Sequence, residues 1–255
     1  GLSDREKGWG MAGETWQGLA ALETLGGETW FQLGDRDLAT HLLRTQALNQ
    51  GKTLTEVTAQ LCKALVPTLN LLPMSDDPVK TIIETDAGDL AFQHYFVRER
   101  CMPVLTGFRF EGIESAQPQQ EFLNLIQNEN LAAIVICPSN PFVSVEPMLA
   151  LPGVREALKN NPAPVIAVSP IVAGAALKGP TAKMMKELSM PTSARAVAKY
   201  YGDVLDGFVI DQSDEFQVEA IEALGIKTWL APTIMKDLQD RIDLAQQVLQ
   251  FSKSL

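Results

Sequence analysis

From about residue 118 to the C-terminus, short apolar runs alternate with amphipathic segments. The apolar runs predict strands at 131–137, 164–168, 207–211 and 227–231, and the amphipathic segments predict helices at 118–128, 153–160, 181–188, 193–201, 214–224 and 234–252. Strands that are apolar at nearly every position are typical of parallel sheets buried between two helical layers. The pattern therefore predicts an α/β fold, a Rossmann-like parallel sheet with helices on both faces.

The preceding part of the chain begins with two predicted helices. Leucines spaced along one helical face predict a helix over 36–50, which ends at Gly51. The sequence Thr53-Leu-Thr-Glu56 is a capping box that opens a second helix, and Pro67 follows its apolar stripe.

A β-rich stretch separates these helices from the regular pattern. The segments 81–85 and 90–97 flank a Gly-containing turn and predict a hairpin, and alternation over 104–110 predicts a third strand. We expect a single domain over 1–255 in which about 70–112 forms a smaller antiparallel β insertion.

Composition and charge argue against several classes of binding partner and metal site. The chain has 255 residues and a formal net charge of −10, which repels nucleic acid and anionic lipid, so neither is expected to bind. No apolar run approaches the ~20 residues that a membrane-spanning helix needs. Three widely spaced cysteines favour a reducing compartment and hence a cytoplasmic location, and two histidines argue against a His-based zinc site.

Polar and small residues follow the first two predicted parallel strands. They are Ser139, Asn140, Ser169, Gly174, Lys178 and Gly179. Ligands of open parallel sheets bind outside the carboxyl ends of the strands, at a switch point in the strand order. Hydroxyl groups, close backbone approach at glycine and a lysine charge suit a phosphorylated ligand. The same residue types dominate ordinary turns, and a surface lysine is commonly only solvated, so both interpretations stay open.

Two acidic clusters lie upstream. Asp35 and Asp37 lie at the start of the helix predicted over 36–50, where aspartate commonly caps a helix. Asp76 and Asp77 stand between two prolines and suit an Asx turn. Either cluster could instead supply carboxylates for Mg²⁺, which prefers oxygen ligands. No G-x-S-x-G motif accompanies the histidines, so a Ser-His-Asp hydrolase is not indicated.

Several segments, taken in order, resemble the 2-phospho-L-lactate transferase family. They are 30–41, 72–78, 92–93, 137–145, 168–172 with 178–180, and 200–211, so the similarity covers nearly the whole chain. Proteins of the gluconeogenesis-factor type share the fold and the Pro73-Met-Ser-Asp-Asp-Pro78 pattern. They lack the forms seen here at 34–41 and 138–141.

The resemblance implies an enzyme of coenzyme F420 biosynthesis. Such a transferase moves a phospho-lactyl or phospho-enolpyruvyl group from a guanosine diphosphate-linked donor to the ribityl hydroxyl of the deazaflavin Fo, releases GMP and requires Mg²⁺. The resemblance places Gln32 and Asp35 at Fo, although a basic residue can replace Gln32 elsewhere in the family.

The same resemblance assigns the remaining site residues. The nucleotide and phosphate site is expected at Ser139, Asn140, Ser169, Gly174, Lys178 and Gly179. The family opens with a Gly-rich strand–loop–helix unit, which is not found after Gly1. We therefore expect the metal ligands in an N-terminal segment that is missing here, with Asp76 and Asp77 as weaker candidates.

Two further interpretations remain open. The chain could be a non-catalytic nucleotide-sugar-binding regulatory protein of the gluconeogenesis-factor type, or an α/β domain whose loops are only turns. The helix carrying Met184 and Met185 could present an apolar face for a homodimer or pack into the core. The motifs do not fix which three-carbon acid is transferred, because that choice depends on pocket shape.

Overall fold

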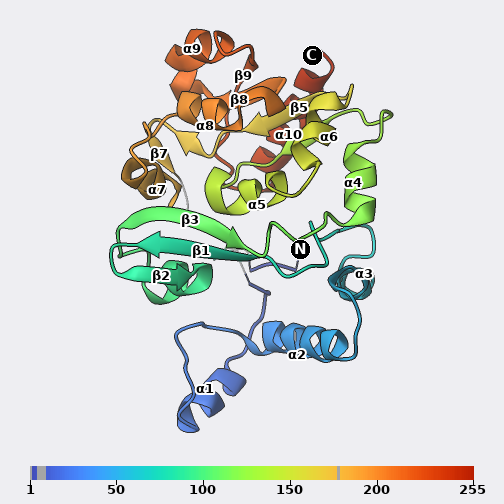
Figure 1. The fold of residues 1–255 in the computed structure, drawn as a ribbon, viewed down its shortest axis with the longest axis vertical. Helices are drawn as coiled ribbons and strands as arrows, with labels where there is room; N and C mark the ends of the chain where they lie inside the picture. Colours follow the sequence, from blue (N-terminus) through green and yellow to red (C-terminus); the bar gives the residue numbers. More distant parts are fainter. Residues whose placement is uncertain (1, 5–9, 177–178) are drawn as a thin grey trace.

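The largest sheet of the described structure has four parallel strands, which lie in the upper part of Figure 1. The computed structural model describes residues 2–4, 10–176 and 179–255. The strands lie side by side in chain order: β4 (Ile134–Ile136), β5 (Val165–Val168), β8 (Gly207–Asp211) and β9 (Lys227–Ala231). The predicted parallel sheet is confirmed. Among the described strands the order has no reversal, and β4 is shorter than expected because it pairs with β5 at three residues only.

The connections between these strands cover one face of the sheet. They contain α5 (Glu146–Leu149), α6 (Val154–Asn160), α7 (Thr181–Glu187), α8 (Ala194–Tyr201) and α9 (Val218–Glu222). Right-handed crossovers between strands that advance in one direction place every connecting helix on the same side. Accordingly Val165, Ala167 and Phe208 share one hydrophobic cluster with residues of α6 to α9.

The opposite face is covered by α10 (Leu238–Ser252). Ile166 and Val209 pack there against Leu244 and Val248. Val135 of β4 is in register with Ile166 but remains 40% exposed. Helices thus lie on both faces, as predicted, but the cover on the α10 side does not extend to β4.

The β insertion is a separate antiparallel sheet with the order β2-β1-β3. Its strands are β1 (Lys80–Thr85), β2 (Gly88–Ala91) and β3 (Leu105–Glu111). The predicted strand over 90–97 is wrong beyond Ala91, because the chain continues into a π-helix, η1 (His94–Arg98). Tyr95 of this turn is fully buried in the cluster that also contains the parallel strands, and that packing outweighs the local β pattern.

Four further helices complete the N-terminal part and the entry to β4. They are α1 (Gln17–Thr24), α2 (Asp35–Asn49), α3 (Leu54–Leu65) and α4 (Gln120–Ile126). The capping box of Thr53 and Glu56 at α3 is confirmed. Helix α1 was not predicted, and it contains no buried residue. Figure 1 shows α1 and α2 at one end of the molecule, beyond the antiparallel sheet.

Short elements connect the strand ends. They are η2 (Pro141–Val145), β6 (Ile171–Val172), β7 (Ala175–Ala176), η3 (Gly202–Val204) and η4 (Gln212–Gln217). The predicted helix over 214–224 is divided into the 3-10 turn η4 and the short α9. The reason is the fully buried Asp214, whose carboxylate accepts hydrogen bonds from Ala173 N (2.9 Å) and Gln217 Nε2 (2.7 Å).

The structure bears on the predicted dimer surface and on the expected absence of a membrane-spanning helix. Met184 and Met185 are fully buried, so they pack in the core and offer no surface for a dimer. The homodimer itself stays a prediction. Among the described residues no helix is both long and apolar enough to cross a membrane.

Candidate functional site

A cavity of about 790 Å³ lies beside the carboxyl ends of the parallel strands. This volume falls within the ~300–1,000 Å³ range of small-molecule sites. Its wall includes Ser139 and Asn140 after β4, Ser169 after β5, Thr233 after β9, Thr181 of α7, Arg241 of α10, and Phe92 and Phe96 of the insertion. Segments far apart in sequence therefore meet at one pocket.

The sequence-predicted phosphate residues are only partly brought together. Ser139, Asn140, Ser169 and Gly179 all line the cavity. Gly174 does not line it: this residue forms the turn between β6 and β7, at φ 77°. Lys178 lies outside the described residues.

Two of these polar side chains are engaged by their own loops. The Asn140 Oδ1 accepts hydrogen bonds from Phe142 N (2.9 Å) and Val143 N (3.3 Å) and so caps η2. The Ser169 Oγ donates to Ile171 O (2.8 Å) and accepts from Ile171 N (3.1 Å). These contacts fit the turn interpretation, and they make both residues rigid parts of the wall.

Asp211 at the end of β8 fixes a neighbouring part of the wall. Its buried carboxylate accepts hydrogen bonds from Thr233 N (3.0 Å) and Thr233 Oγ1 (3.1 Å), and from Ser213 N (3.0 Å) and the Ser213 hydroxyl. Burial raises the pKa of Asp211, but the hydrogen bonds from Ser213 and Thr233 outweigh it and hold the pKa below its usual range. The carboxylate therefore ties the ends of β8 and β9 together.

Other polar groups of the wall remain unpaired within the described part of the chain. The hydroxyls of Ser139, Ser144 and Thr181 and the guanidinium of Arg241 have no protein partner there. Sequence reasoning had found Ser139 but missed the other three. Only the folded arrangement brings Arg241, in the last helix, back to the ends of β4 and β5. Groups without protein partners are the ones that can bind a polar ligand.

The insertion contributes an aromatic surface. The rings of Phe92 and Phe96 are stacked, with centroids 5.5 Å apart and planes 5° from parallel. Both residues line the cavity, and Phe96 is 38% exposed. A flat pair of rings at a pocket wall suits contact with an aromatic ring of a ligand.

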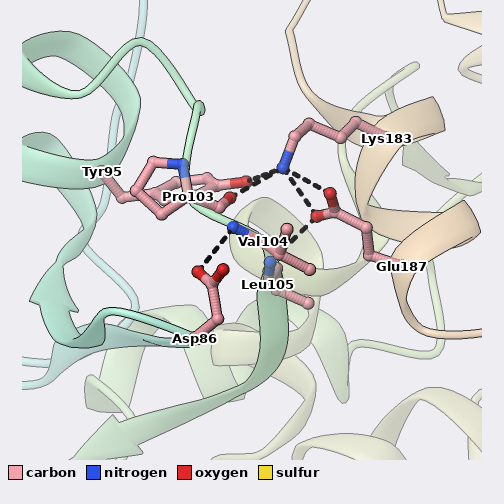
Figure 2. Close-up of polar contacts among 7 residues, drawn as sticks. All are labelled: Asp86, Tyr95, Pro103, Val104, Leu105, Lys183 and Glu187. Carbon is pink, nitrogen blue, oxygen red and sulfur yellow. Dashed lines mark hydrogen bonds and ion pairs between the residues drawn. The ribbon is translucent and has the colours of Figure 1, made fainter.

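A polar cluster joins the insertion to α7 (Figure 2). The Lys183 ammonium donates to Pro103 O (2.9 Å), Tyr95 Oη (3.3 Å) and the Glu187 carboxylate (2.7 Å), and Glu187 also accepts from Leu105 N (3.0 Å). Burial lowers the pKa of Lys183, but its contacts with Glu187 and Tyr95 outweigh burial and raise it overall. Because Tyr95 precedes Phe96 and Lys183 lies two residues after Thr181, the cluster links two walls of the cavity.

The loop between η1 and β3 is held from its other side as well. The Asp86 carboxylate accepts from Val104 N (3.0 Å), as Figure 2 shows, and Asp86 N donates to Val104 O (3.0 Å). Arg100 and Cys101 adopt positive φ angles of 51° and 56°. Such backbone angles are uncommon outside glycine and persist where surrounding contacts impose them.

The two residues predicted to contact Fo, Gln32 and Asp35, lie on either side of the start of α2. Gln32 is exposed and follows Trp30, whose ring packs edge-on against His94 of η1 at 5.0 Å. The Asp35 carboxylate accepts hydrogen bonds from the Thr15 hydroxyl, Gly18 N (2.9 Å) and Gln17 N (3.1 Å), and these bonds lower its pKa. Asp35 thus caps α1. The described residues that line the cavity include neither Gln32 nor Asp35.

The acidic pair proposed as weak metal ligands is also engaged. Asp76 accepts hydrogen bonds from Thr55 N (2.7 Å) and Thr55 Oγ1 (3.0 Å), and Asp77 accepts from Gln117 N (2.8 Å). Within 2–4, 10–176 and 179–255, no group of three or more His, Cys, Asp or Glu side chains could hold a metal ion. The role of Asp76 and Asp77 as metal ligands stays a prediction.

Comparison with models of protein families shows the family to which this chain belongs. The family model described as 2-phospho-L-lactate transferase CofD matches residues 2–232. The chain belongs to the CofD family. The resemblance seen in the sequence motifs is thereby confirmed.

Individual CofD relatives agree with the family match. A phosphoenolpyruvate transferase of Kitasatospora aureofaciens is 39% identical over 98% of this chain and 79% of its own length. A 2-phospho-L-lactate transferase of Methanosarcina mazei is 38% identical over 97% of this chain and 80% of its own length. Relatives with both names are thus about equally similar.

A solved structure confirms the fold class. A crystallised UPF0052 family member from Bacillus halodurans superposes with a TM-score of 0.53 at 15% identity, covering 80% of this chain and 70% of the other. At this identity the match concerns the fold alone.

Proposed function

We propose that this CofD family member transfers a phospho-lactyl or phospho-enolpyruvyl group in coenzyme F420 biosynthesis. The donor is a guanosine diphosphate-linked three-carbon acid, the acceptor is the ribityl hydroxyl of Fo, and GMP is released. The observation that carries the proposal is the family match over 2–232, together with a pocket at the strand ends of the size that such a donor needs.

The chemistry is a phosphoryl-type transfer. The acceptor hydroxyl oxygen attacks the phosphorus that bears the three-carbon acid, so one P–O bond forms there. The P–O bond to the GMP phosphate breaks, GMP leaves, and the hydroxyl loses its proton. Catalysis of this kind depends mainly on positioning and on neutralising charge around the phosphorus.

The pocket offers groups suited to both substrates. Unpaired hydroxyls of Ser139, Ser144 and Thr181 can donate to phosphate oxygens, and the ring pair of Phe92 and Phe96 can contact an aromatic heterocycle. Wall residues already hydrogen-bonded to their own loops need no reorganisation when the ligand binds. These parts of the wall are therefore preorganised, which lowers the entropic cost of binding.

The Mg²⁺ requirement stays a prediction. Mg²⁺ is usually bound through one or two carboxylates together with substrate phosphate oxygens and water, so Asp76, Asp77 and ligands outside the described residues all remain candidates. An assay with Mg²⁺ titrated from zero, with EDTA as the blank, measures this dependence directly. A rate unchanged by EDTA would exclude the requirement.

The transferase assay combines Fo with either guanosine diphosphate-linked acid and Mg²⁺, and separates GMP and phosphorylated deazaflavin by chromatography. Product from one or both donors is expected, and the ratio of kcat/KM values shows which acid is preferred. The absence of product with both donors, with tight UDP-sugar binding and no Fo binding by calorimetry, would instead favour the regulatory nucleotide-sugar binder.

A further inference from the structure

Arg241 is a cation of the pocket wall that no motif singled out. It lies in the first turn of α10 and lines the same cavity as Ser139 and Thr181. Among the described residues that line this cavity it is the single charged side chain. It also has no hydrogen-bond or ion-pair partner in the described part of the chain.

Arg241 is exposed and has no such partner, whereas two other arginines of this chain are paired with carboxylates. Arg155 bonds Glu146 at 2.9 Å, and Arg109 bonds Glu84 at 3.0 Å and Asp89 at 2.8 Å. The aspartates nearest to Arg241 in sequence are engaged otherwise. Asp240 completes the capping box of α10 with Asp237 and accepts from Lys236 N (2.7 Å), and Asp243 accepts from Gln239 Nε2 (2.7 Å). None of these carboxylates is bonded to the guanidinium.

A cation in the pocket wall favours the binding of an anionic ligand to this protein. The formal net charge of −10 creates a field that opposes binding of a further anion. A guanidinium offers five N–H donors in a planar fork that matches two phosphate oxygens at once. The hydroxyls of Ser139 and Thr181 on the same wall can donate to the remaining oxygens.

We infer that Arg241 binds the diphosphate of the donor nucleotide. The inference rests on the proposed function for the identity of the ligand, a guanosine diphosphate ester. Arg241 is thus a substrate-binding residue, and its charge sets the affinity of the pocket for a nucleoside diphosphate over the nucleoside alone.

The test is calorimetric titration of GDP and of guanosine, at one fixed Mg²⁺ concentration, into the wild-type chain, Arg241→Gln and Lys236→Gln. Lys236 is the matched control, because it is an exposed cation five residues away that does not line the cavity. Arg241→Gln should weaken GDP binding about 10- to 100-fold, as expected for a lost hydrogen bond to a charged group. Guanosine affinity and the Lys236→Gln protein should change less than about 2-fold.

Each other outcome overturns the inference: wild-type GDP affinity in Arg241→Gln, an equal loss for guanosine, an equal loss in Lys236→Gln, or no GDP binding by the wild type. The transferase assay on the same proteins separates this inference from the proposed function. Arg241-dependent GDP binding without product formation would reject the transferase and keep the diphosphate site. Product formation with an unchanged donor KM in Arg241→Gln would keep the transferase and reject Arg241 as the diphosphate-binding residue.

Discussion

The carboxylate of Asp211 holds the ends of β8 and β9 together, and replacing it measures that connection. It accepts four hydrogen bonds, two from Ser213 and two from Thr233. Thr233 is 4% exposed, whereas Ser213 is exposed and can bond to water. In Asp211→Asn the amide can keep its oxygen toward Thr233 and turn its NH₂ toward Ser213. In Asp211→Ala the Thr233 N–H loses its partner.

The magnitudes follow from this difference. Hydrogen bonds to charged groups contribute about 1.5–3 kcal/mol each, and an unsatisfied buried donor costs about 1–3 kcal/mol. We expect Asp211→Asn to lower the free energy of unfolding by about 1.5 kcal/mol and Asp211→Ala by about 3 kcal/mol. Urea unfolding followed by fluorescence, with equal m-values, provides the measurement.

The pH dependence gives the refuting result. Because the pKa of Asp211 is lowered in the folded state, its contribution is complete above the unfolded-state pKa of about 3.9 and is lost as pH falls through the lower folded-state value. The stability difference between wild type and Asp211→Asn should therefore be equal at pH 7 and pH 5 and smaller at pH 3.5. A difference that stays constant or grows on acidification would refute the role of the charged carboxylate, as would equal losses in the two variants.

Three further substitutions test contacts between elements and a helix cap by the same unfolding assay. Lys183→Met removes the link between α7 and the insertion and should lower the free energy of unfolding by about 2 kcal/mol. This value is smaller than for a fully buried ion pair because a third of the Lys183 side chain is exposed, and an unchanged stability would contradict the link. Gly207→Ala would place a Cβ 2.7 Å from Phe251 Cε1 and should cost about 1–3 kcal/mol, and a neutral result would mean that α10 shifts freely. Thr53→Ala should cost about 1 kcal/mol through the lost cap of α3, and Thr53→Ser, which keeps the hydroxyl, should restore most of it.

The sequence predicted the parallel sheet well because burial on both faces leaves a strong local pattern. The boundaries of β8 and β9 agree with 207–211 and 227–231. The strand predicted at 90–97 failed because Tyr95 is packed by residues distant in the chain, which no local pattern encodes. The division of 214–224 has the same kind of cause, since Asp214 bonds to the turn after β6.

The candidate site was predictable only where it follows strand ends. Ser139, Asn140 and Ser169 could be named because carboxyl ends of parallel strands share one edge of a sheet. Arg241 and the ring pair reach the pocket through tertiary structure, by the return of α10 and by the attachment of the insertion to α7. Whether a polar side chain is free or already bonded to its own loop, as in Asn140, is also decided by the fold.

The uneven cover of the parallel sheet has a mechanical consequence. Among the described strands β4 pairs with β5 alone, and its Val135 is 40% exposed. Local unfolding of β4 is therefore expected to cost less free energy than local unfolding of β5 or β8. Ser139 leaves the sheet from β4, whereas Thr233 is anchored to β8 through Asp211. The wall of the pocket at Ser139 is therefore expected to be more mobile than the wall at Thr233. If so, ligand binding should slow hydrogen–deuterium exchange of backbone amides mainly along β4.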